Sequence, residues 1–174
     1  MATGINNKKE RTMKVLLWLA LLFCMVILSK FILFKKPPAY YKNYYSREYK
    51  NYTVKKGWKQ ANLKPFSTIR LFSSKRVSSD YSYKNIGGNI IGFIPLGILL
   101  PLLLPFWRNF LRTMTTIFFI SLSFEAIQLL AGMGIFDVDD LILNTTGGMA
   151  GYILYAVVRQ VIKWQENNQA EAIY

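Results

Sequence analysis

Acidic and amide side chains inside apolar runs are the residues of this sequence best suited to chemistry. Glu125 and Gln128 are three positions apart, which places them on one face of a helix. A carboxylate near the middle of a membrane-spanning helix costs roughly 3 kcal/mol to insert, so it usually faces a protein interior and often marks a functional site. Glu125 is therefore the candidate general acid or base, although the sequence establishes no catalytic residue.

A second acidic group, Asp137, Asp139 and Asp140, lies shortly before Asn144. Carboxylate and amide oxygens suit Ca²⁺ or Mg²⁺, but the spacing is not that of an EF-hand. Asp137 and Asp140 could instead accept hydrogen bonds from the free N–H groups that open the following helix. We favour helix capping. The identity of any metal stays unknown, and no cofactor is expected.

Other chemistries are excluded by residue types that the chain lacks. There is no histidine, so Ser-His-Asp triads, Cys-His pairs and histidine metal ligands are ruled out. Cys24 is the only cysteine of the chain, which excludes an internal disulfide and a zinc-cysteine cluster. It lies within an apolar run.

Four apolar runs must position these side chains, and each is long enough to approach or cross a bilayer. They are residues 15–34, 86–106, 114–130 and 141–158. Twenty helical residues span roughly 30 Å, the thickness of the hydrocarbon core. We therefore expect an all-α, polytopic membrane protein with about four transmembrane helices. The first run is expected to be an uncleaved anchor, and the second, with its three prolines, is expected to bend or break.

Basic residues in the short connections predict the orientation. The tail 1–14, the link between the second and third runs and the segment after the fourth all carry Lys or Arg, whereas the link around Asp137 carries none. This pattern places both termini in the cytoplasm of a cell-membrane protein. The long segment 35–85 is an exception to this rule. It holds thirteen Lys and Arg residues, yet this orientation places it on the extracellular side.

The outer segment 35–85 interleaves Tyr and Trp with Lys and Arg. This pairing also occurs in single-stranded nucleic-acid sites, but an extracellular location argues against nucleic acid. Membrane lipid headgroups, a cell-wall precursor or an anionic wall polymer are the better partners. The alternative is a structural collar of interfacial aromatic residues with no specific ligand.

Helix direction gathers the polar side chains at the outer side of the membrane. The expected result is one outward-opening ligand pocket, with Lys30 as a counter-charge for Glu125. Its members are Asn85, Asn89, Glu125, Gln128, Asp137, Asp139, Asp140 and Asn144. The alternative is that the amide side chains only hold helices together, each contact contributing roughly 0.6–2 kcal/mol.

Small residues indicate where helices approach closely. Gly88 and Gly92 are four positions apart, and so are Gly147 and Gly151. Such patterns let backbones pack together, with Pro95 and Gly148 nearby. They are a weak signal for a homo-oligomer.

The stretch 62–155 resembles the VanZ-like family of small membrane proteins. The matching pieces, in order, are Asn62–Ile69, Asn85–Asn89 leading into Phe93–Gly97, Ser123–Gln128, Phe136–Asp140, and Asn144–Gly148 continuing to Tyr152. This chain departs from the family at Lys64, where an aliphatic residue is common, and at Gly134, where many members carry a basic residue. The resemblance implies low-level resistance to glycopeptide antibiotics, teicoplanin in particular, in Gram-positive bacteria.

Three functions are compatible with these features. The first is a membrane protein that binds or alters an outer-leaflet envelope component and thereby lowers glycopeptide susceptibility. The second is a membrane enzyme acting on a lipid-linked precursor through Glu125. The third is a small transporter or flippase subunit, which would need more than one copy because four spans show no clear inverted repeat.

Overall fold

The computed structural model describes residues 2–34, 47–73 and 79–171, with side chains over 8–34, 48–73 and 85–170. The described part is helical apart from one isolated parallel β-bridge. Its helices are α1 (Ala2–Leu33), α3 (Arg47–Gln60), α4 (Ser67–Ser73), α5 (Ser79–Leu103), the 3₁₀ helix η1 (Pro105–Arg108), α6 (Phe110–Leu130) and α7 (Val138–Glu171).

Four of the described helices are long and apolar enough to cross a membrane, in agreement with the predicted all-α, multi-pass fold. The qualifying stretches are Lys8–Leu33, Asn85–Leu103, Phe110–Leu130 and Val138–Ala170. The third and fourth are longer than the apolar runs suggested, because helix α6 begins at Phe110 and α7 continues well beyond residue 158. Residues 35–46 and 74–78 of the predicted outer segment 35–85 lie outside the described residues, and the described part contains α3, α4 and the start of α5.

Helix α5 is not interrupted by its internal prolines. Pro95 and Pro101 both lie inside the helix, which ends at Leu103. Leu104 takes an extended conformation (φ −136°, ψ 140°) and Pro105 then opens η1. The break expected in this run therefore comes only at its end, where the next proline follows a residue that has already left the helical region.

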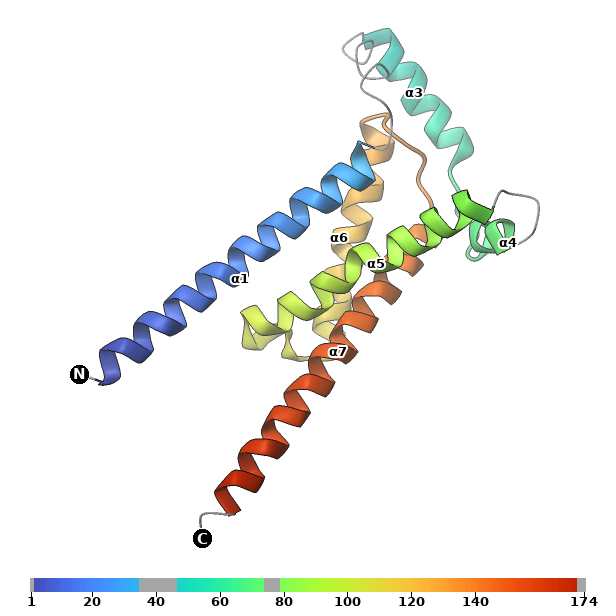
Figure 1. Ribbon diagram of the computed structural model, residues 1–174. Coiled ribbons are helices and arrows are strands. Elements are labelled where there is room, and N and C mark those ends of the chain that lie inside the picture. Colours follow the sequence, from blue (N-terminus) through green and yellow to red (C-terminus); the bar gives the residue numbers. More distant parts are fainter. Residues whose placement is uncertain (1, 35–46, 74–78, 172–174) are drawn as a thin grey trace.

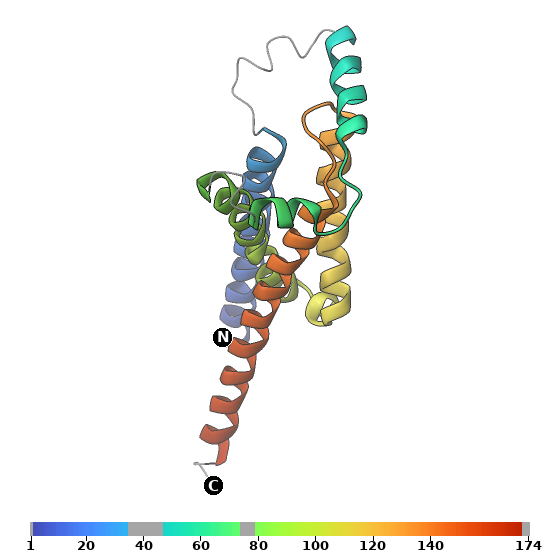
Figure 2. The same ribbon diagram turned by 90° about the vertical axis from the view of Figure 1, so that its right-hand side faces the viewer.

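Helices α5 and α7 form the most extensive contact of the bundle, and α6 packs on α7. Helix α1 lies across α5 and α6 (Figures 1 and 2). Where these helices meet, the buried core consists of residues from α1, α5 and α6: Cys24, Leu28, Ile32, Phe93, Leu96, Leu100, Ile117 and Phe124. Many large apolar side chains of α1 and α7 remain exposed, as expected for helices whose outer surface faces lipid.

Three glycines allow the close approach of α5 and α7. A Cβ added at Gly97, Gly147 or Gly151 would lie 2.0 Å from a backbone oxygen of the opposite helix. Gly92 is less tight, since its Cβ would meet a Leu28 methyl group at 3.2 Å. Gly88 does not have the predicted packing role: it is exposed and no described atom would lie within 4 Å of its Cβ.

Two further predicted packing residues differ in their surroundings. Gly148 is buried, and its Cβ would meet the Ile117 side chain of α6 at 2.5 Å, so Gly148 brings α6 close to α7. Pro95 is exposed on α5. Gly97, which the spacing patterns did not single out, is as tightly enclosed as Gly147 and Gly151.

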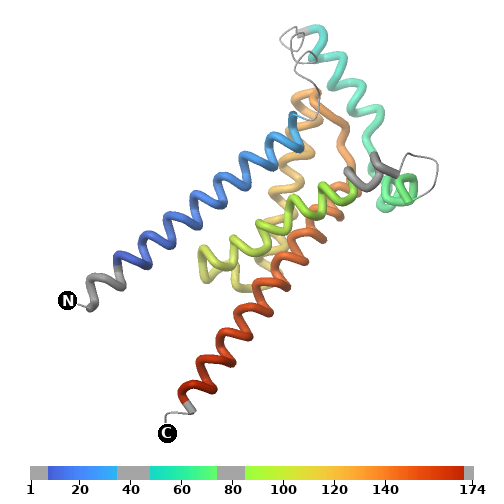
Figure 3. The backbone as a smooth tube through the Cα atoms, viewed as in Figure 1, coloured from blue at the N-terminus to red at the C-terminus, as the bar shows by residue number. Residues whose placement is uncertain are grey.

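Helix α1 begins and α7 ends toward the same end of the bundle, and α3 and α4 lie at the other end (Figures 1 and 3). We call the end that carries α3 and α4 the distal end. Helix α3 contacts α6 there: a Cβ at Gly57 would lie 3.0 Å from the Gly134 oxygen. Gly132, at φ 68°, takes the left-handed conformation that suits glycine just after α6. The distal end therefore also receives the α6–α7 connection.

Candidate functional site

Two segments far apart in the sequence are joined at the distal end by backbone hydrogen bonds. The Asn62 N–H donates to the Phe136 oxygen at 2.8 Å, and the Val138 N–H donates to the Asn62 oxygen at 3.0 Å. These bonds form the isolated parallel bridge between Asn62 and Asp137. We refer to Asn62–Ile69 together with Asp137–Asp140 as the clasp.

Asp137 connects both halves of the clasp through its carboxylate. One oxygen accepts from Asn62 Nδ2 at 2.7 Å and from the Asp139 N–H at 2.9 Å, and the other accepts from Thr68 Oγ1 at 2.6 Å. Because Asp137 immediately precedes α7, its bond to the Asp139 N–H is an N-cap. The capping role predicted for Asp137 is thus confirmed.

Asp139 is fully buried and caps a different helix from its own. Its carboxylate accepts the N–H groups of Phe66, Thr68 and Ile69 at 2.5, 2.7 and 3.1 Å. These are the free donors at the start of α4, where a negative charge is stabilised by the helix dipole. Phe66 has φ 64°, a rare conformation for a residue with a side chain, and its N–H donates to the Asp139 carboxylate.

Three further predicted site residues, Asn89, Asp140 and Asn144, connect the spanning helices to one another. Asn89 Nδ2 of α5 donates to Asp140 Oδ1 of α7 at 2.6 Å. Asn144 Nδ2 donates to Ser121 Oγ of α6 at 2.8 Å, while Asn144 Oδ1 is buried and has no hydrogen-bond partner among the described residues. Helices α5, α6 and α7 are therefore linked by polar side chains at buried or half-buried positions.

Glu125 and Gln128 of α6 each reach another segment. Glu125 is 1% exposed, and its Oε2 accepts the Asp137 N–H at 3.0 Å. Gln128 Nε2 donates to the Ile32 oxygen at the end of α1, at 2.5 Å. Lys30, considered as a counter-charge for Glu125, has an exposed side chain. The contact seen for Glu125 is with a backbone N–H of the clasp.

Seven of the eight predicted pocket residues thus make hydrogen bonds that join different segments of the chain, and the eighth, Asn85, is half-buried on α5. The structure adds Asn62, Thr68 and Ser121, which residue types alone did not mark as site residues. Pro65 followed by Ser67 and Thr68 is typical of a helix start. That signal predicts α4, but it does not reveal that the capping carboxylate comes from α7.

The carboxylates of the clasp are held by N–H, amide and hydroxyl donors. Within the described residues, no group of three or more His, Cys, Asp and Glu side chains is placed to hold a metal ion. Chemically, the arrangement can fix α3, α4 and the α6–α7 connection as one rigid cap over the distal ends of α5, α6 and α7. A ligand that contacts this cap would meet a preorganised polar surface.

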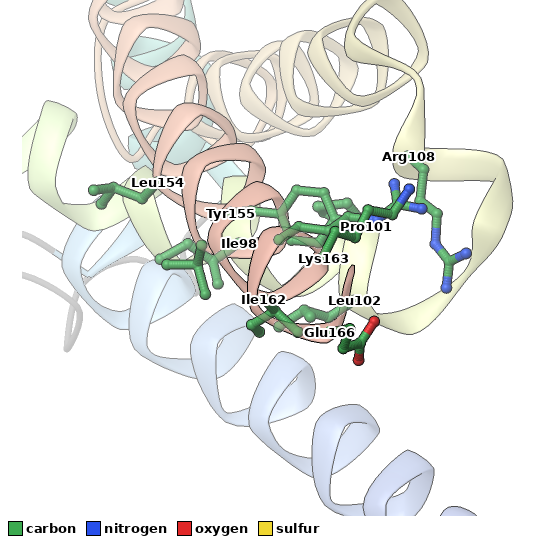
Figure 4. A pocket seen from close by; sticks show the side chains of 11 residues that line it. Ile98, Pro101, Leu102, Arg108, Leu154, Tyr155, Ile162, Lys163 and Glu166 are labelled. Carbon is green, nitrogen blue, oxygen red and sulfur yellow. The ribbon is translucent and has the colours of Figure 1, made fainter. Parts of the chain in front are cut away.

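A cavity lies at the opposite end of the bundle, away from the clasp. It has a volume of about 490 Å³ and is formed by α5, η1 and the second half of α7 (Figure 4). Apolar side chains make most of its wall, and Arg108, Arg159, Lys163 and Glu166 lie around it. None of the predicted pocket residues lines it.

Comparison with known proteins gives one family and one curated relative. Residues 16–159 match the family model described as VanZ/LLP1, which is most of the chain. Over 76 residues the chain is 36% identical to Protein VanZ of Enterococcus faecium. That alignment covers 44% of this chain and 47% of the relative, so the chain spans about half the length of the curated protein that it matches. No solved structure matches.

Proposed function

Because this chain belongs to the VanZ/LLP1 family, we propose that it contributes to low-level resistance to glycopeptide antibiotics, teicoplanin in particular. In this proposal it acts by binding or altering a cell-envelope component in the outer leaflet of the membrane. The family match covers the spanning helices and the clasp together, so the proposal concerns the whole membrane unit rather than one motif.

The observation that carries the proposal is the polar clasp at the distal end, in which the carboxylates of Asp139 and Asp140 are buried. Burying carboxylates and amides near a membrane costs free energy, so such groups often mark a functional site. Here they order α4 and the α6–α7 connection on the side away from both termini. With both termini in the cytoplasm, as the loop charges predict, the clasp faces the cell envelope.

The surface next to the clasp suits an envelope molecule. Helix α3 carries exposed lysines, Lys55, Lys56 and Lys59, and the exposed aromatic side chains Tyr52 and Trp58. Cations attract anionic headgroups or wall polymers, and aromatic rings favour the headgroup level of a bilayer. A lipid-linked wall precursor offers both an anionic group and a membrane anchor, so it is the substrate class that fits best.

Cysteine labelling tests the orientation. In a background with Cys24→Ser, we expect Lys59→Cys on α3 to react with a membrane-impermeant maleimide on intact cells. Asn167→Cys, exposed near the end of α7, should react only after permeabilisation. Labelling of Asn167→Cys on intact cells, with Lys59→Cys protected, would show that the topology is the reverse of the predicted one and would refute the envelope-facing proposal.

Susceptibility measurements test the function and the part that Glu125 plays in it. Deletion of the protein should lower the minimal inhibitory concentration of teicoplanin, and re-expression should restore it. Glu125→Gln keeps an oxygen that can accept the Asp137 N–H, whereas Glu125→Leu leaves that N–H without this acceptor. We expect Glu125→Leu to lose resistance and Glu125→Gln to retain most of it at equal membrane abundance.

The outcomes separate the role of the protein from the role of this residue. Unchanged teicoplanin susceptibility on both deletion and overexpression would refute the resistance function. Full resistance in Glu125→Leu would remove only the contribution of the Glu125 contact. Loss in both variants at equal abundance would mean that the charge or proton of the carboxyl group is required, as the enzymatic alternative demands.

A further inference from the structure

The cavity at the end of the bundle that carries the termini exists because two neighbouring helices differ in length. Helix α5 stops at Leu103 and the chain turns away through η1, whereas α7 continues to Glu171. The last turns of α7 therefore extend past α5 (Figure 1). The space of about 490 Å³ between them is within the range of roughly 300–1,000 Å³ that is typical of ligand sites.

The wall of this cavity is apolar and faces the surroundings of the bundle. Leu102, Leu154, Val158 and Ile162 line it, and each of them is 45–57% exposed. They belong to helices that are apolar enough to cross a membrane. A lipid chain is the apolar group that such a wall meets in a bilayer.

Among the described residues that line the cavity, three cations outnumber one carboxylate. Arg159 and Lys163 are four residues apart on α7, so they share one helix face. Arg108 comes from η1, which is held against α7 by the Tyr152 hydroxyl donating to the Arg108 oxygen at 2.5 Å. Figure 4 shows Arg108, Lys163 and Glu166 around the apolar side chains. The three cations against Glu166 leave a net charge of +2 (3 − 1).

We propose that this cavity binds an anionic phospholipid, with its phosphate between Arg108, Arg159 and Lys163 and an acyl chain along the wall of α5 and α7. Basic pockets between spanning helices are suited to anionic headgroups. An apolar wall joined to a cationic rim complements both parts of such a lipid, whereas a soluble anion would use only the rim. The site stands apart from the clasp and does not depend on the resistance function.

Lipid competition on the purified full-length protein tests this proposal. The protein in a non-ionic detergent is offered equal amounts of dioleoyl phosphatidylglycerol and dioleoyl phosphatidylcholine, and bound lipids are counted by native mass spectrometry. We expect phosphatidylglycerol to be preferred, and the preference to fall about tenfold or more in Arg108→Gln/Arg159→Gln/Lys163→Gln, since this variant removes all three cations that attract the headgroup. Equal binding of the two lipids by the unaltered protein would overturn the proposal.

A matched control variant loses the same number of positive charges, but at positions away from the cavity. Lys8→Gln/Lys9→Gln/Lys14→Gln also removes three exposed cations near one chain terminus, but none of these lysines lines the cavity. It should keep the phosphatidylglycerol preference. An equal loss in this variant would mean that net charge, rather than the cavity, attracts the lipid, and the proposal would fail.

Two further measurements separate a lipid from a free phosphate. Val158→Trp should fill the cavity while leaving its cations in place, and we expect it to lose the bound phosphatidylglycerol. Glycerol 3-phosphate should not displace the lipid at equal concentration. If Val158→Trp retains the lipid, or if glycerol 3-phosphate displaces it, the cations bind a phosphate group alone, and the proposed lipid site would be refuted. Unchanged helicity by circular dichroism identifies variants that remain folded.

Discussion

Replacing Gly147 with alanine is expected to separate α5 from α7 and to destabilise the bundle strongly. The new Cβ would lie 2.0 Å from the Ile90 oxygen and 2.8 Å from the Ile90 carbonyl carbon, both of which are backbone atoms that cannot move without moving α5. Overpacking costs roughly 1–3 kcal/mol in a tight core. Because the most extensive helix contact is displaced here, we expect a loss at the top of that range or beyond.

The measurement is thermal unfolding of the purified protein in detergent, with Gly88→Ala as the matched control. At Gly88 no described atom lies within 4 Å of an added Cβ. Alanine is the better helix former by up to about 1 kcal/mol, so Gly88→Ala should be neutral or slightly stabilising. The two substitutions are chemically identical, but only Gly147→Ala should lower the unfolding temperature. Equal unfolding temperatures for Gly147→Ala and Gly88→Ala would contradict the close α5–α7 contact.

Replacing Asp139 with asparagine is expected to release α4 from the bundle. The buried carboxylate accepts three backbone N–H groups on its two oxygens, and asparagine replaces one oxygen with an NH₂ group that faces N–H donors. Hydrogen bonds to a charged group contribute roughly 1.5–3 kcal/mol each. The amide oxygen can keep the two bonds that one carboxylate oxygen accepts, so at least one bond is lost and the others lose the charge of their acceptor. We expect a destabilisation of about 1.5–3 kcal/mol, concentrated in the clasp.

Hydrogen exchange measures this effect residue by residue. The amides of Phe66, Thr68 and Ile69 should exchange faster in Asp139→Asn, because their acceptor has been weakened. Glu10→Gln, which makes the same chemical change at an exposed position of α1, should leave these amides unaffected. If the three amides keep their protection in Asp139→Asn, Asp139 does not hold α4 in place.

Much of the fold followed from properties that are local in the sequence. The lengths of the apolar runs predicted four spanning helices, because the thickness of a bilayer requires about twenty apolar residues. Helix direction then predicted that Asn89, Glu125 and Asp140 would lie at the same end of the bundle. The acidic residue directly before α7, Asp137, was predicted to cap it for the same local reason.

The partners of the polar residues could not be predicted, because they depend on contacts between distant segments. Asp139 lies in the first turn of α7, where capping its own helix would be expected, yet it binds N–H groups seventy or more residues earlier in the chain. Asn62 and Thr68 have ordinary turn residue types, and only the bridge to Asp137 gives them a place in the site. The cavity near Arg108 was equally hidden, since it results from where α5 ends beside α7.

Consecutive residues are enough to predict that the chain forms membrane-spanning helices, and that polar groups with a high free energy of insertion lie near one end of them. This is so because the period and length of apolar runs, and the direction of each helix, are properties of consecutive residues. Tertiary structure alone decided which glycines touch and which donors each carboxylate accepts. Gly147 and Gly88 share the same small-residue pattern, but only the crossing of α5 and α7 places Gly147 against a backbone oxygen while Gly88 remains exposed.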